Sequence, residues 1–262
     1  LGDALYERKD ESGAMAAYSA VLKADPSAKG FFKKYAALVM KSGKDLEIVS
    51  VLNAAIAAGE ADAEMYVRLG SIYYKQGNFS KAVTMYDKAS QLNPKDGSLL
   101  IKLAQSQAKS GALNAAILTY EQAIAMNPQA NEEHKALGDL YMQQKKTDSA
   151  IKAYKNYLEK SQDNDIARLV GENALKSNNY KEAVKYLAMV TGADATDKDH
   201  LMKFAMACYQ SKDEFRAYQL FKQLANITPR DPVVFEKLYE IAGRAGTKDE
   251  VLNYLRKFAE LK

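Results

Sequence analysis

The sequence predicts an all-α fold, a solenoid of paired helices, on the basis of three observations. A pattern of small and apolar residues recurs in frames that begin at Ala63, Gly97 and Asn131, which are 34 residues apart. Within each frame the apolar residues follow one another at intervals of three and four, which is the spacing of one helix face. Glycine and proline stand near the middle and at the end of most frames, where helices end. A fixed period of this length is typical of stacked repeats.

The frames divide the chain into one partial unit and seven further units. The partial unit covers residues 1–28, and the others cover residues 29–62, 63–96, 97–130, 131–163, 164–197, 198–231 and 232–262. The fifth of these eight units is one residue shorter than its neighbours, a change that can bend the array. Because the first residue is Leu1 and it falls inside a repeat, we expect the sequence to be a piece of a longer chain.

Each unit is predicted to contain two antiparallel helices that meet through small residues, which let helices approach closely. The first small position holds Gly2, Ala36, Gly70, Ala104, Gly138, Gly171 and Ala205. The second holds Ala14, Ala82, Ala116, Ala150, Ala183 and Ala217, each followed four residues later by Tyr18, Tyr86, Tyr120, Tyr154, Leu187 and Phe221. Ile48 in one unit, and Tyr239 and Val251 in the last, depart from this rule. They predict adjusted packing in the first case and a looser or terminal unit in the second.

The ends of the helices are marked by residues that stop a helix. Glycine adopts the left-handed conformation that closes a helix, and we expect it to end first helices at Gly43, Gly77, Gly111 and Gly246. Proline cannot continue a helix and follows a polar residue between several units, at Pro26, Pro94, Pro128 and Pro229.

The run from Leu69 to Pro94, with Gly70, Tyr73, Ala82, Tyr86 and Ala89 at its repeated positions, resembles the tetratricopeptide repeat family. The resemblance covers essentially the whole chain. It implies a right-handed superhelical solenoid of about seven to eight helix-turn-helix units, with a concave groove lined mainly by the first helix of each unit. The implied function is a non-enzymatic scaffold that binds a protein partner, as a peptide or a helix, in that groove.

Composition excludes several other classes of function. The net charge is only +4 with a pI near 8.8, and cations alternate with acids, which argues against a nucleic-acid groove. No apolar run is long enough for a membrane span. Two histidines, His134 and His200, and one cysteine, Cys208, supply too few groups for a metal site or a catalytic pair, and no phosphate-binding, zinc or nucleophile motif is present. We therefore predict no catalytic residue, no cofactor and no metal, and a core position for Cys208.

The candidate partner-binding residues lie on the first helices of three successive units. They are Lys33, Lys41, Arg68, Tyr74, Lys75, Lys102 and Lys109. Late in the first helices a column of cations recurs, formed by Lys41, Lys75, Lys109, Lys176 and Arg244. Such a column suits an acidic or carboxylate-bearing peptide. It is also explained without any ligand, because the helix macrodipole favours cations in the last turn by about 0.3–1 kcal/mol.

Several alternatives stay open at this point. Family members that hold chaperone tails use groove asparagines, and the corresponding column here has none, which disfavours that ligand. The chain can instead be a self-assembly module of a multiprotein complex, or the recruiting arm of a larger enzyme whose catalytic domain is absent here. The alanine- and lysine-rich repeats favour a bacterial origin, with cytoplasm and periplasm both open.

Overall fold

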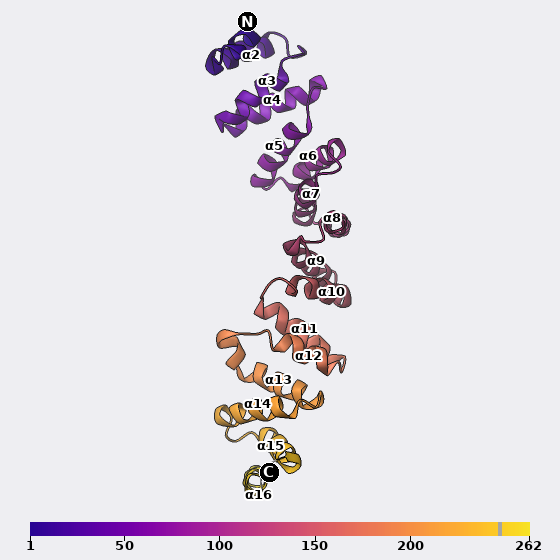
Figure 1. The fold of residues 1–262 in the computed structure, drawn as a ribbon. Helices are drawn as coiled ribbons and strands as arrows, with labels where there is room; N and C mark the ends of the chain where they lie inside the picture. The colour runs from indigo at the N-terminus through magenta and orange to yellow at the C-terminus, as the bar shows by residue number, and fades with distance from the viewer. Residues whose placement is uncertain (246–247) are drawn as a thin grey trace. The chain divides into compact units, whose positions relative to one another are not determined.

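The computed structural model of the chain describes residues 1–245 and 248–262. In these residues it contains sixteen α-helices, one short 3-10 helix and no β-strand, which confirms the all-α prediction (Figure 1). The helices fall into two compact units, Leu1–Gln144 and Lys145–Lys262, and we describe each by itself.

Unit 1 consists of nine helices, four pairs followed by α9. They are α1 (Gly2–Glu7), α2 (Glu11–Ala24), α3 (Phe32–Ser42), α4 (Asp45–Ala58), α5 (Ala63–Lys75), α6 (Phe79–Leu92), α7 (Gly97–Lys109), α8 (Leu113–Met126) and α9 (Asn131–Gln143). Each helix from α1 to α8 packs on the one that follows it in the chain. The first helices thereby alternate with the second helices, and the core cluster from Ala14 to Leu103 takes buried residues from both.

Unit 2 has the same alternation with one interruption. Its helices are α10 (Thr147–Leu158), α11 (Asn164–Lys176), α12 (Tyr180–Leu187), α13 (Lys198–Gln210), α14 (Glu214–Ile227), α15 (Pro232–Ala245) and α16 (Lys248–Leu261), with the 3-10 helix η1 (Gly192–Thr196) between α12 and α13. Over both units, six first helices begin at the first residue of a predicted repeat frame. They are α5, α7, α9, α11, α13 and α15. The organisation as a single solenoid over residues 1–262 stays a prediction.

At the predicted small positions the two helices of a pair approach each other closely. A methyl group added to Gly70 of α5 would lie 2.8 Å from the Tyr86 ring of α6, and one on Gly171 of α11 would lie 2.7 Å from the Leu187 side chain of α12. Tyr86 and Leu187 are themselves buried. A small residue sixteen positions before a large one therefore makes the room that the large side chain fills.

The core residues follow the predicted faces. In unit 1 the fully buried residues include Phe32, Leu52 and Leu69, and in unit 2 they include Phe221 and Leu238. Of the departures from the small-residue rule, Ile48 is fully buried, whereas Tyr239 and Val251 near the end of the described chain are only half-buried. The looser or terminal character of the last pair stays a prediction.

Three of the four glycines predicted to end a first helix lie in the described residues, and each has a positive φ. Gly43, Gly77 and Gly111 have φ angles of 71°, 73° and 86°, whereas Gly246 lies outside the described residues. In four other repeats the same position is taken by Lys9, Lys145, Asn178 and Lys212, which also have positive φ, from 56° to 65°. The turn between the helices thus keeps its left-handed residue even where the sequence offers no glycine.

The pair α11 and α12 departs from the rest because α12 is short. It has 8 residues, whereas α14 has 14, and the chain then runs through η1. The Asn164 amide at the start of α11 donates to the Thr191 carbonyl (3.0 Å) and to Asp194 (2.8 Å), and Gln162 donates to the Thr191 hydroxyl (2.9 Å). These hydrogen bonds hold the segment after α12 against α11.

Candidate partner-binding surface

The outward polar side chains of successive first helices touch one another, and we call this surface the first-helix face. In unit 1, Lys34 of α3 lies 3.2 Å from both Asp3 and Glu7 of α1. In unit 2, Lys203 of α13 lies 2.7 Å from Glu172 of α11. These contacts cross from one first helix to the next without a second helix between them. A ligand that runs across α1 and α3, or across α11 and α13, would therefore meet polar side chains from both helices.

Two of the predicted binding cations already have an acidic partner in unit 1. The Lys41 ammonium lies 2.6 Å from Glu11 of α2, whose carboxylate raises the pKa of Lys41. The Arg68 guanidinium lies 3.6 Å from Asp45 of α4. In each case the acid is the first residue of the preceding second helix. These two side chains are partly neutralised before any ligand arrives.

The same arrangement recurs in unit 2. Arg244 of α15 lies 2.6 Å from Glu214, the first residue of α14. Thus Lys41 and Arg244, two members of the predicted cation column, are bound within the chain. The column is therefore not a uniform ladder of available charges.

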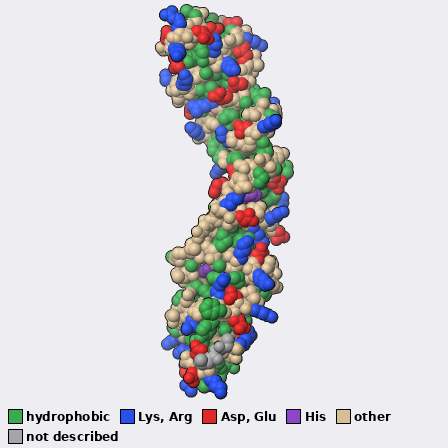
Figure 2. Space-filling model, in the orientation of Figure 1, with side chains coloured by type: hydrophobic (Ala, Val, Ile, Leu, Met, Phe, Trp, Pro, Cys, Tyr) green, Lys and Arg blue, Asp and Glu red, His purple; other side chains and the backbone are tan. Residues whose placement is uncertain are grey.

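Three other predicted cations lie in the middle of unit 1 without such a partner. Among residues 1–245 and 248–262, no acidic group forms an ion pair with Lys75 of α5 or with Lys102 and Lys109 of α7. Lys75 and Lys109 are exposed and Lys102 is half-buried. Lys33 of α3 is also exposed and has no ion pair within the described part of the chain. Over the face drawn in Figure 2, cations and acids are interspersed and form no broad basic patch. The unpaired cations differ from the paired ones in having no ion pair within the described residues.

The aromatic residue among the candidates, Tyr74, is only partly accessible. Its ring is half-buried and packs edge-on against Phe79 of α6, with the ring centroids 5.3 Å apart. The contact fixes the ring at the junction of α5 and α6, beside Lys75. A side chain that is already held rigidly loses little conformational entropy when a ligand binds. Tyr74 therefore stays a candidate although its ring is only partly accessible.

The groups with catalytic chemistry are placed as structural residues. Cys208 is fully buried, and burial raises the pKa of its thiol to about 12, so it is not a nucleophile at neutral pH. His200 is 2% exposed and its ring lies 6.0 Å from that of Phe204. Burial, and secondarily Arg168, lower the pKa of His200. His134 is half-buried. Across the described residues no cluster of His, Cys, Asp and Glu has the composition of a metal site, and no helix is apolar over a length sufficient to span a bilayer.

The ion pairs that sequence reasoning missed have a recognisable signal. Glu11 and Lys41 are thirty residues apart, and so are Glu214 and Arg244. In both pairs the acid begins a second helix, and the cation lies near the end of the next first helix. The separation of thirty residues is the repeat period of 34 residues minus four. The spacing alone does not decide the pairing, because Asp45 stands thirty residues before Lys75 but pairs with Arg68 instead.

Comparison with known proteins gives one family. Four family models, each described as tetratricopeptide repeat, match residues 63–96, 101–165, 141–202 and 199–231. Together they span residues 63–231, well over half of the chain. No curated protein sequence matches the chain significantly.

Many solved structures are similar to the chain. The C-terminal part of a TPR repeat-containing protein from Cytophaga hutchinsonii is 15% identical, with 87% of this chain and 95% of that one covered and a TM-score of 0.50. MamA is 28% identical, with 61% and 93% covered and a TM-score of 0.47. YrrB, described as a TPR protein with an unusual peptide-binding site, is 18% identical, with 68% and 92% covered and a TM-score of 0.43. The first of these likenesses supports the fold.

Proposed function

Since the chain belongs to the tetratricopeptide repeat family, whose members serve as protein-interaction scaffolds, we propose that its first-helix face in unit 1 binds an acidic segment of a protein partner. The segment is a peptide or a helix that carries carboxylates across α5 and α7. Lys75, Lys102 and Lys109 pair with those carboxylates, and Tyr74 packs against an apolar side chain beside them. Lys33, Lys41 and Arg68 contribute at the edge of the site.

The observation that carries this proposal is the contrast between paired and unpaired cations. Lys34 and Lys41 on α3 and Arg68 on α5 have acidic partners within the chain, whereas Lys75 and Lys109 are exposed and have no ion pair in the described residues. A cation whose charge is already compensated gains less from a new carboxylate than an uncompensated one. The macrodipole alone explains a lysine in the last turn. At the position that Glu11 takes relative to Lys41, the acid before Lys75 is Asp45, which pairs with Arg68, and the residue before Lys109 is Phe79.

A binding measurement with the whole chain tests the proposal. The probe is a fluorescein-labelled nonapeptide of alternating glutamate and serine, and the readout is fluorescence anisotropy. Lys75→Gln and Lys109→Gln together should weaken binding about tenfold, since two unpaired charges are lost. Lys41→Gln should weaken it less than twofold. Lys95→Gln, in the exposed loop before α7, is the matched control and should change nothing.

Ionic strength gives a second readout for the same site. Raising the salt concentration from about 50 to 300 mM shortens the screening length, and should weaken the wild-type interaction more than that of the double variant. An affinity that responds neither to salt nor to the loss of Lys75 and Lys109 would remove this surface from consideration.

One observation favours self-assembly as a second candidate function. None of the residues of α16 is buried, and Leu252 and Leu255 are 50% and 39% exposed. The equivalent of Leu255 in α14 is the fully buried Phe221. Sedimentation velocity over a wide concentration range tests whether copies of the chain associate. If they associate through α16, the double variant Leu252→Lys with Leu255→Lys should abolish the association.

A further inference from the structure

The connection between α12 and α13, residues 188–197, is held against α11 by polar contacts, and we call it the α12–α13 linker. The Asn164 amide donates to the Thr191 carbonyl and to Asp194, and the Thr191 N–H donates back to the Asn164 side-chain oxygen over 3.2 Å. Within the linker only Val190 is buried. Hydrogen bonds that face solvent contribute little net stability. The linker therefore belongs to the parts of the chain that open most easily.

His200, just after the linker, occupies a position that most other repeats fill with a core residue. The third residue of the frame is buried and apolar in five of the seven frames, as Phe31, Met65, Leu99, Ile166 and Val234, and Glu133 is half-buried. His200 is 2% exposed, and its Nδ1 atom is buried without a hydrogen-bond partner in the described chain. A buried polar atom without a partner costs stability. Folding of the repeat therefore does not require an imidazole at this position.

The surroundings of the imidazole oppose a positive charge on it. The ring is almost completely shielded from water, and its centre lies 6.0 Å from that of the Phe204 ring. It belongs to the first turn of α13, where the helix macrodipole disfavours a cation. Burial, and then Arg168 of α11, lower the pKa of His200. The ring therefore takes up a proton more readily when it is exposed than when it is buried.

The acids near the ring are already engaged. Asp194, Asp197 and Asp199 act on the pKa of His200 in the opposite direction to burial. Each of them has another partner in the chain, these being Asn164 and Arg168 for Asp194, the His200 backbone N–H for Asp197, and Lys203 for Asp199. The three carboxylates therefore compensate an imidazolium only in part.

The helices that pack on α13 contribute acids that are paired or exposed. Ion pairs join Glu172 of α11 to Lys203, Glu182 of α12 to Lys155, and Glu214 of α14 to Arg244. Asp165 of α11 is exposed. Apart from Arg168, the other charged residues of these three helices are cations, which cannot compensate an imidazolium. They are Lys176, Lys181, Lys185, Arg216 and Lys222.

We propose that acid releases the α12–α13 linker from α11. When the His200 imidazole takes up a proton, the charged ring leaves its buried position, and the hydrogen bonds between the linker and Asn164 break. Asp194 then moves away from Arg168, and the start of α11 becomes accessible. The chain thereby carries a pH-sensitive device at one helix pair, and the rest of unit 2 stays folded while it opens.

The distance between the linker and α11 tests the proposal in the whole chain. Spin labels are attached at Asp165→Cys of α11 and Ala193→Cys of the linker, both exposed positions. The background is Cys208→Ala, since Ala174 holds the same position of the repeat as Cys208. Double electron–electron resonance should show one narrow distance at pH 7.5. A second, longer distance should grow at least threefold in population between pH 7.5 and pH 5.0.

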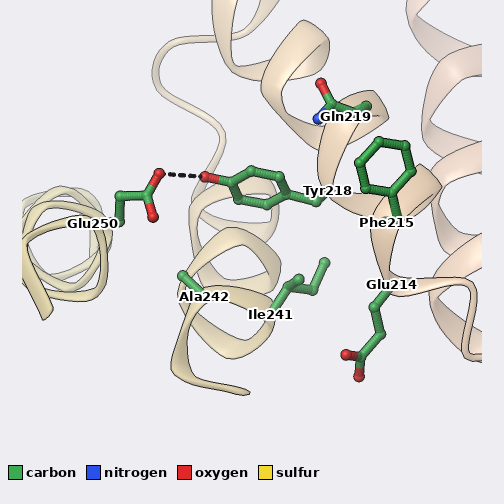
Figure 3. A pocket seen from close by; sticks show the side chains of 7 residues that line it. All are labelled: Glu214, Phe215, Tyr218, Gln219, Ile241, Ala242 and Glu250. Atoms are coloured by element: carbon green, nitrogen blue, oxygen red, sulfur yellow. Dashed lines mark hydrogen bonds between the residues drawn. The ribbon is translucent and has the colours of Figure 1, made fainter. Parts of the chain in front are cut away.

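A control pair of labels spans the cavity bounded by α14, α15 and α16 in the same unit (Figure 3). This cavity lies beside Phe215, and the Tyr218 hydroxyl donates to Glu250 there over 3.0 Å. Labels at Gln219→Cys of α14 and Asn253→Cys of α16 should give the same distance at both pH values, because these helices stay folded when the linker opens.

Substitutions identify the group that titrates. His200→Leu installs the residue that α7 has at this position, Leu99, and should abolish the growth of the longer distance. His200→Gln keeps a polar side chain without a titrating group and should do the same, so it decides if His200→Leu fails to fold. Asn164→Ala should show the longer distance at both pH values, because the linker loses its hydrogen bonds. Circular dichroism melting establishes that each variant is folded.

Three results would overturn the proposal. One is a wild-type distance between linker and α11 that is the same at both pH values. Another is equal growth of the longer distance in the His200 variants, because a carboxylate would then be the titrating group. The third is a change in the control pair that accompanies the change in the linker, since unit 2 would then unfold as a whole.

Discussion

Single residues with positive φ close the turn between the helices of most pairs, and they differ in how well they suit it. Glycine takes this conformation without a steric cost, whereas a side chain with a Cβ costs about 1 kcal/mol or more. Gly77 has a φ of 73°, and Lys212 has a φ of 65° at the same position of its own pair. Lys212 is therefore a strained residue at the position where Gly77, in another repeat, is unstrained.

Exchanging these residues should move stability in opposite directions. Lys212→Gly should raise the free energy of unfolding by up to about 1 kcal/mol, part of the relief being offset by the greater freedom of glycine in the unfolded chain. Gly77→Ala should lower it by about 1 kcal/mol. Urea denaturation followed by circular dichroism measures both changes, and Lys95→Gly in a loop is the control for adding a glycine.

His200 makes the stability of unit 2 depend on pH. Burial lowers its pKa below the ordinary value of 6.5, with Arg168 adding to the effect, while Asp194, Asp197 and Asp199 act in the opposite direction. The unfolded chain consequently binds a proton more readily than the folded one as pH falls below about 6.5, and the free energy of unfolding falls with it. We expect stability to be highest above this range.

The variant His200→Leu separates this effect from other titrations. The drop in the free energy of unfolding between pH 7 and pH 5 should shrink in His200→Leu and persist in His134→Gln, since the second substitution leaves the buried imidazole in place. A wild-type protein whose stability is the same at both pH values would contradict the assignment.

The helix pair is the element on which the fold is built, and its closest contact is between a small residue and a large one. In α5 and α6 these are Gly70 and Tyr86, and the equivalent residues of α7 and α8 are Ala104 and Tyr120, both buried. The second pair shows that a methyl group is accommodated opposite a tyrosine ring. Among the described residues a larger side chain stands at this position only in the last pair, where Tyr239 precedes the partly exposed Leu255 by sixteen residues.

Substitutions at Gly70 should therefore separate by size. Gly70→Ala should cost about 1 kcal/mol of unfolding free energy or less, because a small shift of the Tyr86 ring accommodates the methyl group. Gly70→Leu should cost about 3 kcal/mol or more, because overpacking at this point forces the two helices apart. Chemical denaturation measures both, and equal costs for the two variants would contradict the contact.

The elements of this fold were predictable from the sequence to the extent that they obey the repeat. The positions of Gly70, Ala82 and Tyr86 recur in register, so burial and pairing could be inferred from spacing. The interruption after α12 was not predicted, because Asn164 and Gln162 hold the segment around Thr191 through hydrogen bonds between residues about 30 positions apart. Polar contacts of this kind leave no periodic mark.

The candidate sites were predictable only in part, for a related reason. The sequence located the cations of the first helices but not their pairing. Glu11 pairs with Lys41, whereas Asp45, at the equivalent position before Lys75, pairs with Arg68. The partial burial of Tyr74 was not predicted, because its contact with Phe79 crosses from one helix to the next. The cavity beside Phe215 depends on what three helices leave unfilled, and no single stretch of sequence contains that information.

On the scale of the whole molecule, stability in such an array is a sum of contributions from each helix pair and from the contacts between neighbouring pairs. Leu238 of α15 is fully buried in the core of unit 2. Leu238→Ala should lower the free energy of unfolding locally by about 2–5 kcal/mol. We expect the loss to be concentrated in the helices that share this core.

Hydrogen exchange with mass spectrometry checks this expectation. Amides of α13 to α16 should exchange faster in Leu238→Ala, whereas those of α3 to α8 in unit 1 should keep their wild-type rates. Phe32→Ala, in the core of unit 1, is the reciprocal variant and should give the opposite pattern. Faster exchange throughout the chain in both variants would show that the two units unfold together.

The buried Cys208 of α13 has a practical consequence for such studies. It is the only cysteine in the chain, and its side chain is inaccessible to solvent while the helix pair is closed. A coloured thiol reagent in excess will react only when α13 separates from its neighbours. The rate of colour formation therefore times the opening of unit 2 in the unmodified protein, without an added label.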